Sequence, residues 1–172
     1  MNLQDTDGTT ALITASYFGQ VDVVHELLQN NELAVNLQVT TGLTALYMAS
    51  QNSHVDVVRE LLRSITLDVN LQMADGTTAL ITASYFGHVE VVCELLQNNR
   101  VDVNLQHTSD CTALDMALGE KNDDVVRLLE KYRDEEWKRL ENGGVARRRN
   151  GITARVMNGN RLWNRSAVNK SC

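Results

Sequence analysis

The sequence predicts an all-α protein, a solenoid of stacked helix–turn–helix units, and two recurring phrases are the main evidence. The phrase Asn-Leu-Gln recurs with a constant step of 34 residues, beginning at Asn2, Asn36, Asn70 and Asn104. The phrase Thr-Ala-Leu keeps the same step, beginning at Thr10, Thr44, Thr78 and Thr112. Repetition of this length is typical of arrays of small units, because one unit cannot bury its apolar face without a neighbour. Such an array offers a long exposed surface rather than an enclosed pocket.

The first half of each unit predicts a turn followed by a short helix, and the third unit is the clearest example. Asp75 and Gly76 favour a tight turn because both residue types tolerate a positive φ. Thr78 stands where a hydroxyl can cap the N-terminus of a helix over residues 79–86. Gly87 then supplies the left-handed residue at which helices commonly end.

The second half of the unit predicts an amphipathic helix over residues 89–98. Its apolar side chains form one stripe at helical spacing, made by Val89, Val92, Leu95 and Leu96. Residues 101–104 then lead in an extended conformation into the next turn. Each unit is therefore expected to run turn, helix, turn, helix, loop, and its apolar stripe must pack against the neighbouring units.

These features resemble the ankyrin repeat. The third unit carries the family's positions in order, at Gly76, Thr78, Leu80, Ala83, Gly87, His88, Glu90, Val91, Val92, Leu95, Leu96, Asp102, Val103 and Asn104. The resemblance covers about residues 1–132 and implies four repeats, at about 1–35, 36–69, 70–103 and 104–132. It implies an all-α ankyrin solenoid, in which helix pairs are joined by loops that resemble β-hairpins.

The chain departs from the family's pattern at two positions of every repeat. Alanine replaces the family's proline, at Ala11, Ala45, Ala79 and Ala113. The family's histidine is replaced by Ile13, Tyr47, Ile81 and Asp115. Alanine offers helix propensity where proline offers a preset φ, so the fold is expected to survive. The family's histidine ties neighbouring repeats through hydrogen bonds, and we expect apolar contacts to replace those ties here.

The two ends of the array are expected to differ. The second helix of the fourth repeat meets no helix breaker after residue 123, so it is expected to continue to about residue 141, with residues 133–142 as a C-terminal cap. Residues 143–172 form a basic tail that is expected to be disordered. The first repeat keeps a full interior apolar pattern where solenoids usually carry a polar cap, so the chain is expected to begin inside a longer array.

Charge is divided unevenly along the chain. Residues 1–130 carry 5 basic and 18 acidic side chains, whereas residues 131–172 carry 11 basic and 4 acidic ones. No apolar run is long enough to cross a bilayer, and the N-terminus lacks the features of a secretory signal. The 3 cysteines follow no pairing pattern. Together these observations predict a cytoplasmic protein, with the nucleus as the alternative location.

The sequence carries no metal-binding, phosphate-binding or nucleophile–base motif, so we assign no catalytic residue, metal or cofactor. The predicted function is that of a non-catalytic protein–protein interaction module, which binds a partner protein along the concave side of the stack. One alternative is a docking fragment of a larger protein, such as a channel, a kinase or a ubiquitin-ligase adaptor. The other is a scaffold whose basic tail binds nucleic acid or an anionic surface.

The resemblance implies partner-binding positions at the loop tips and at the exposed ends of the first helices. These positions are Asp7, Tyr17, Phe18, Thr40, Thr41, Gln51, Asn52, Asp75, Tyr85, Phe86, Thr108 and Ser109. Exposed aromatic rings beside acidic residues suit a basic or amphipathic segment of a partner. The alternative is that the rings partly pack between adjacent first helices.

Two further sets of residues carry hypotheses. The segments that end in Asn70 and Asn104 resemble the pattern modified by the asparaginyl hydroxylase that acts on ankyrin repeats, and the alternative is a hydrogen-bonding role within the hairpin. In the tail, Arg147, Arg148 and Arg149 suggest binding to nucleic acid, to an anionic membrane surface or to an import receptor. The alternatives there are a solubilising role and a contact with the acidic array of the same chain.

Overall fold

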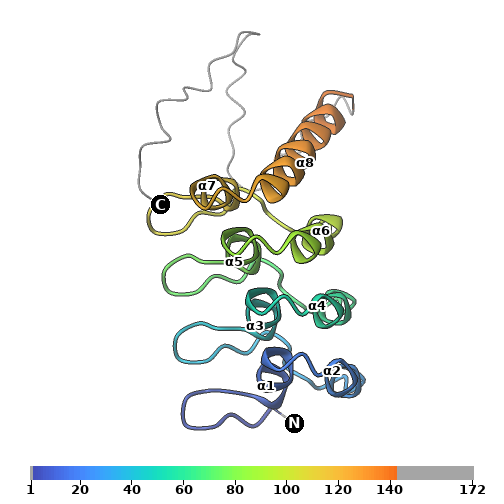
Figure 1. Cartoon of the computed structure of the whole chain (residues 1–172). Coiled ribbons are helices and arrows are strands. Elements are labelled where there is room, and N and C mark those ends of the chain that lie inside the picture. The colour runs from blue at the N-terminus through green and yellow to red at the C-terminus, as the bar shows by residue number, and fades with distance from the viewer. Residues whose placement is uncertain (1, 143–172) are drawn as a thin grey trace.

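In the computed structural model the described residues are 2–142, with side chains as far as Glu135. Within them the chain forms eight helices and no strand. In chain order these are α1 Ala11–Tyr17, α2 Val21–Leu28, α3 Ala45–Gln51, α4 Val55–Leu62, α5 Ala79–Tyr85, α6 Val89–Gln97, α7 Ala113–Gly119 and α8 Asp123–Asn142. Figure 1 shows them stacked as successive helix pairs. The prediction of an all-α solenoid is confirmed.

Threonine caps the N-terminus of every first helix, as predicted. Each threonine hydroxyl accepts a hydrogen bond from the backbone N–H three residues further on, with Ile13, Tyr47, Ile81 and Asp115 as donors. In the fourth repeat the bond is reciprocated, because the Asp115 carboxylate accepts from the backbone N–H of Thr112 at 2.9 Å. The predicted ends of α5 and α6 were one residue too long, since Phe86 and Asn98 are the C-cap residues.

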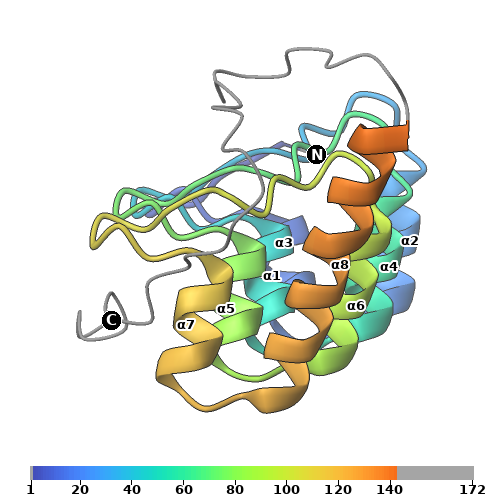
Figure 2. The ribbon, with the colours of Figure 1, turned by 90° about the horizontal axis from the view of Figure 1, so that it is seen from above.

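The helices form two layers. The inner helices α1, α3, α5 and α7 make one layer, the outer helices α2, α4, α6 and α8 make the other, and the loops project from the inner layer (Figure 2). The largest fully buried apolar side chains are Leu61, Leu95, Val24, Val57, Val58, Val91, Val92 and Val125. They belong to one continuous hydrophobic cluster that runs along the stack, so each repeat depends on its neighbours for burial.

Side chains at the same position of different repeats show what the neighbouring repeat contributes. Val57, Val91 and Val125 are all 0% exposed, and each is preceded by another repeat. Val23 holds the same position in the first repeat and is 44% exposed, because no described element covers that edge. Burial of this position therefore comes from stacking and not from the repeat itself.

A hairpin-like loop precedes each inner helix and is closed by backbone hydrogen bonds. In the third loop the N–H of Met73 donates to the carbonyl of Thr77 at 2.9 Å, and the N–H of Gly76 donates to the carbonyl of Met73 at 3.0 Å. Gly76 has a φ of 83°, and a Cβ there would lie 2.6 Å from the carbonyl oxygen of Gln106 in the next loop. Asp110 takes the same place in the fourth loop with a φ of 62°, where no further described loop packs against it.

Hydrogen-bonded ties between repeats are made by the residue that precedes each outer helix from the second repeat onward. Three ring or amide nitrogens bond to carbonyl oxygens at the end of the preceding inner helix: His54 Nε2 to Tyr17 at 2.9 Å, His88 Nε2 to Gln51 at 2.9 Å, and Asn122 Nδ2 to Tyr85 at 2.8 Å. Ile13 and Ile81 are buried, as apolar replacements should be. Apolar contact thus replaces the family's histidine at these two positions, and polar ties between repeats are made at the start of the outer helices.

Candidate protein-binding surface

The loops and the inner helices together form one surface, which we call the inner face (Figure 2). It consists of residues 4–18, 38–52, 72–86 and 106–120. The loops meet the N-terminal ends of the inner helices, so the loop tips and the C-terminal ends of these helices lie on opposite borders of the inner face.

Two exposed aromatic pairs mark the C-terminal border of the inner face. Tyr17 and Phe18 are 46% and 63% exposed, and Tyr85 and Phe86 are 42% and 49% exposed. The rings of each pair meet edge to face, with centroids 4.9 Å apart in the first repeat and 5.1 Å in the third. Phe86 also stacks on His88, with ring centroids 5.8 Å apart. Each ring still leaves a large part of its surface in solvent. Two similar aromatic platforms thus stand two repeats apart.

The second repeat has two amide side chains at this border, and that of Asn52 is engaged. The Nδ2 of Asn52 donates to the carbonyl of Met48 at 2.8 Å and caps α3. The backbone carbonyl of half-buried Gln51 accepts from His88 at 2.9 Å and joins the second repeat to the third. Asn52 therefore contributes less free hydrogen-bonding capacity than the sequence suggested, and the aromatic pairs are the stronger candidates.

The loop tips supply the other candidates, and part of this set also holds the loops together. The backbone N–H and the hydroxyl of Thr40 both donate to the carbonyl of Asp7, at 3.0 and 2.9 Å. The N–H of Thr108 donates in the same way to the carbonyl of Asp75, at 2.8 Å. All four side chains are exposed, as are those of Thr41 and Ser109. The structure thus gives the two threonines a role between loops, whereas the side chains of Asp7 and Asp75 are accessible to a partner.

Asp75 is held in its charged form. Partial burial acts to raise the pKa of its carboxyl, but hydrogen bonds from Thr77 and the proximity of His107 outweigh that effect and lower the pKa. The N–H of Thr77 donates to the carboxylate at 2.9 Å, and His107 Nε2 lies 3.7 Å away. A depressed carboxyl pKa stabilises the loop at neutral pH, and this contribution is lost as pH falls through the folded-state pKa.

Charge on the inner face has one sign. The face carries no lysine or arginine, and its acidic residues are Asp5, Asp7, Asp75, Asp110, Asp115 and Glu120. Aligned carboxylates without compensating cations produce a negative potential, which attracts a cationic segment and repels phosphate. The inner face therefore carries its aromatic pairs at one border and most of its acidic residues in the loops, with Glu120 at the C-terminal end of α7.

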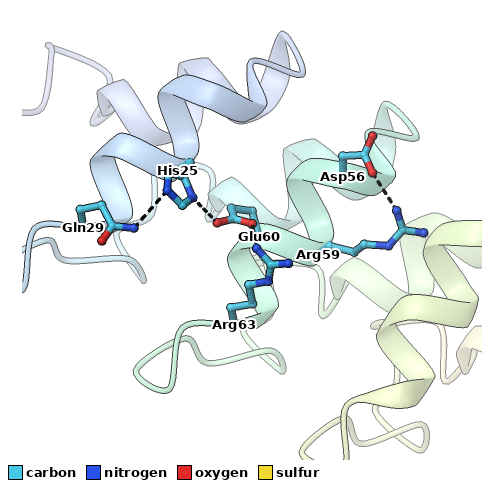
Figure 3. Close-up of polar contacts among 6 residues, drawn as sticks. All are labelled: His25, Gln29, Asp56, Arg59, Glu60 and Arg63. Atoms are coloured by element: carbon cyan, nitrogen blue, oxygen red, sulfur yellow. Dashed lines mark hydrogen bonds and ion pairs between the residues drawn. The ribbon is translucent and has the colours of Figure 1, made fainter.

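The cations of α2 and α4 are paired within the array (Figure 3). His25 of α2 lies 2.6 Å from Glu60 of α4, and Arg63 lies 2.5 Å from the same carboxylate. Arg59 of α4 lies 2.9 Å from Glu94 of α6. The cations are about half or more exposed, so solvent screens these pairs and their contribution to stability is small. The contacts link successive outer helices and use the cations of α2 and α4 internally.

The candidates Asn70 and Asn104 differ in what they bind. The Nδ2 of Asn70 donates to the carbonyl of Arg100 at 2.8 Å, and its Oδ1 accepts from the N–H of Asp102 at 2.9 Å. Asn2 and Asn36 make the same pair of bonds to the loops that follow them. The role is therefore between successive loops, and the expectation of a bond within one hairpin is wrong for Asn70.

Asn104 is exposed, and its amide reaches only Asp102 in its own loop, at 3.3 Å. Hydroxylation stays a prediction, with Asn104 the more accessible side chain.

The glutamine of the recurring phrase forms a second ladder, which the sequence did not reveal. The Nε2 of Gln72 donates to the carbonyl of Gly76 in its own loop at 2.8 Å and to that of Gln106 in the next loop at 3.1 Å. Gln4 and Gln38 repeat the arrangement. The sequence signal for this ladder was the recurrence of glutamine every 34 residues, which places the same side-chain amide between each pair of successive loops.

Replacing Asn70 by alanine should lower the free energy of unfolding by about 1–2 kcal/mol, because the carbonyl of Arg100 and the N–H of Asp102 lose their partner. The matched control is Asn104→Ala, which removes only a contact within one loop and should cost less than about 0.5 kcal/mol. Urea unfolding followed by circular dichroism measures both. Equal losses for the two variants would contradict the inter-loop role.

Three other observations concern metal binding, membrane-spanning helices and the basic tail. Among the described residues no group of three or more His, Cys, Asp or Glu side chains is arranged to hold a metal ion. Within the same part of the chain, none of the helices combines the length and the apolar character needed to cross a bilayer. Arg147, Arg148 and Arg149 lie outside the described residues.

Comparison with protein families identifies the fold's relatives. The family model described as "Ankyrin repeats (3 copies)" matches residues 1–73 and 62–136. This chain belongs to the ankyrin repeat family. Ankyrin repeats are in general non-catalytic modules that bind other proteins. No curated protein sequence matches the chain.

Proposed function

We propose that this protein is a non-catalytic interaction module that binds a partner protein through its inner face. The observation that carries the proposal is the pairing of two exposed aromatic platforms with an acidic border that has no lysine or arginine. Tyrosine and phenylalanine anchors bury much apolar area at little cost in side-chain entropy, and they are enriched among residues that dominate binding. A cytoplasmic or nuclear location is part of the proposal.

The partner that fits this face is a cationic segment with two apolar anchors. Each apolar anchor would pack on one aromatic pair, and lysine or arginine would lie over the ring faces or opposite Asp7 and Asp75. The negative potential of the face speeds the encounter with such a segment. The same potential disfavours nucleic acid at the inner face.

A random peptide display library selected against the full chain tests this proposal. Selected peptides should be enriched in lysine and arginine and should carry two apolar clusters. Truncating either aromatic pair, as Tyr17→Ala with Phe18→Ala or Tyr85→Ala with Phe86→Ala, should weaken binding of a selected peptide about 30-fold, the effect of losing one hot spot of about 2 kcal/mol.

The matched control lies at the same border of the second repeat. Gln51→Ala with Asn52→Ala changes two adjacent polar residues between the aromatic pairs, keeps the Gln51 backbone carbonyl that bonds to His88, and should weaken binding less than about threefold. Isothermal titration calorimetry compares the variants. Peptides without cationic enrichment, or equal affinity for the aromatic variants and the wild type, would rule out the inner face as the binding surface.

A further inference from the structure

The two aromatic pairs form a binding surface with a defined internal distance. Tyr17 with Phe18 and Tyr85 with Phe86 have the same sequence, the same edge-to-face geometry and similar exposure. They stand at the ends of α1 and α5, with α3 packed between these helices. Packed helices lie about 8–10 Å apart, so the pairs are separated by about 16–20 Å. An occupant of both pairs must present two apolar groups at that distance.

The chain's own C-terminal segment carries two apolar groups at a matching distance. Arginine followed by two apolar residues occurs twice in it, as Arg155-Val156-Met157 and as Arg161-Leu162-Trp163. These residues lie outside the described part of the chain. The two triplets are six residues apart, and six residues of extended chain span about 20 Å. An extended chain with this spacing would place the two triplets about as far apart as the aromatic pairs.

We propose that residues 155–163 of this chain bind the inner face of the same molecule, with one Arg-apolar-apolar triplet on each aromatic pair. Apolar side chains and methionine sulfur pack well against aromatic rings, and arginine adds a cation–π contact over a ring face. Gln51 and Asn52 lie at the end of α3, between the two anchors. This inference rests on the proposed function only in using the same face.

Charge and chain length agree with binding in the same molecule. Residues 143–172 carry seven basic residues and no acidic one, and the inner face carries acidic residues and no lysine or arginine. Twelve residues, 143–154, connect the end of α8 at Asn142 to the first triplet. They extend to at most about 40 Å. A tethered segment acts at an effective concentration in the millimolar range, so a weak contact is enough to populate the bound state.

The consequence is that the segment and a partner compete for one surface. A partner gains access only when it displaces residues 155–163, so its apparent affinity for the full chain is lower than for a chain with altered triplets. Modification or capture of the basic segment by another molecule would open the inner face. The array and its tail would then work as one regulated binding unit.

Amide chemical shifts of Tyr17, Phe18, Tyr85 and Phe86 in the full chain test the proposal without any partner. Arg155→Glu with Arg161→Glu should shift all four amides, and so should Val156→Ser with Trp163→Ser, which preserves charge. The control is Arg148→Glu with Lys170→Glu, which changes net charge equally outside the triplets and should leave the four amides in place. Raising NaCl to 0.5 M should move the wild-type shifts toward those of the triplet variants, because screening weakens the contact.

Two results would overturn the proposal. One is that the four amides keep their shifts in both triplet variants, or shift equally in the control. The other is that the wild-type shifts change on tenfold dilution, because the segment would then bind a second copy of the chain. Since no partner is used, either result leaves the proposed function to be decided by the peptide selection.

Discussion

Replacing Val57 by aspartate is expected to destabilise the array by several kcal/mol, enough to unfold the repeats around it at room temperature. Val57 is 0% exposed and lies within the continuous core. An ionised carboxylate placed there has no partner and cannot be solvated, and such a group costs several kcal/mol even after relaxation. Because neighbouring repeats support each other, the damage should extend to the adjoining helices.

The matched control for this prediction is the same substitution at the same position of the first repeat. Val23 is 44% exposed, so the carboxylate of Val23→Asp can stay hydrated and the cost should be below about 1 kcal/mol. Circular dichroism during urea unfolding, with amide hydrogen exchange to locate the loss, distinguishes the two variants. A similar cost at both positions would contradict the conclusion that stacking by the preceding repeat buries this position.

Replacing Ser16, Ser50 and Ser84 together by alanine is expected to raise the free energy of unfolding by about 3 kcal/mol or more. The three hydroxyls are fully buried, and none has a hydrogen-bond partner. A buried hydroxyl without a partner costs about 1–3 kcal/mol, and alanine also has the higher helix propensity. The sites occupy the same position of separate repeats, so their effects should add.

Ser64→Ala is the control of opposite sign. The Ser64 hydroxyl lies 3.0 Å from the Thr66 hydroxyl, so its removal should lower stability slightly. Thermal and urea unfolding of the triple variant, each single variant and the control measure the series. A triple variant no more stable than the wild type would mean that the three hydroxyls do have partners in solution.

Much of the fold could be predicted from the sequence because its signals are local. A threonine before Ala-Leu caps a helix by bonding to a backbone N–H three residues away, so Thr78 could be interpreted without knowledge of any other repeat. Gly87 is local in the same sense. The apolar stripe predicted for α6 is only partly confirmed, because Val92, Leu95 and Leu96 are buried whereas Val89 is 36% exposed. Helix ends were less certain, as Phe86 and Asn98 show, because a C-cap differs little in sequence from a last helical residue.

The contacts between repeats could not be predicted in the same way. Asn70 bonds to Arg100 and Asp102, and Gln72 bonds to the carbonyl of Gln106, so these roles depend on the register in which successive loops stack. Recurrence showed that the residues matter at every junction. It did not show which atoms they join. For the same reason the engagement of Thr40 with the carbonyl of Asp7 was not foreseen.

For the inner face, the sequence named the right elements but could not rank the residues. The structure leaves the rings of Tyr17, Phe18, Tyr85 and Phe86 from 42% to 63% exposed, so each ring keeps a free surface while part of it is covered. It engages the Asn52 amide in capping α3. Exposure and hydrogen bonding, which depend on packing, separate the aromatic candidates from the polar ones.

Amide hydrogen exchange of the full chain with and without a selected cationic peptide tests the binding mode most directly. Protection is predicted at the ends of α1 and α5, around Tyr17 and Tyr85, and in the loops that carry Asp7 and Asp75. The outer helices α2, α4 and α6 should exchange as in the free protein. Protection confined to these outer helices, with the inner face unchanged, would contradict the proposed binding surface.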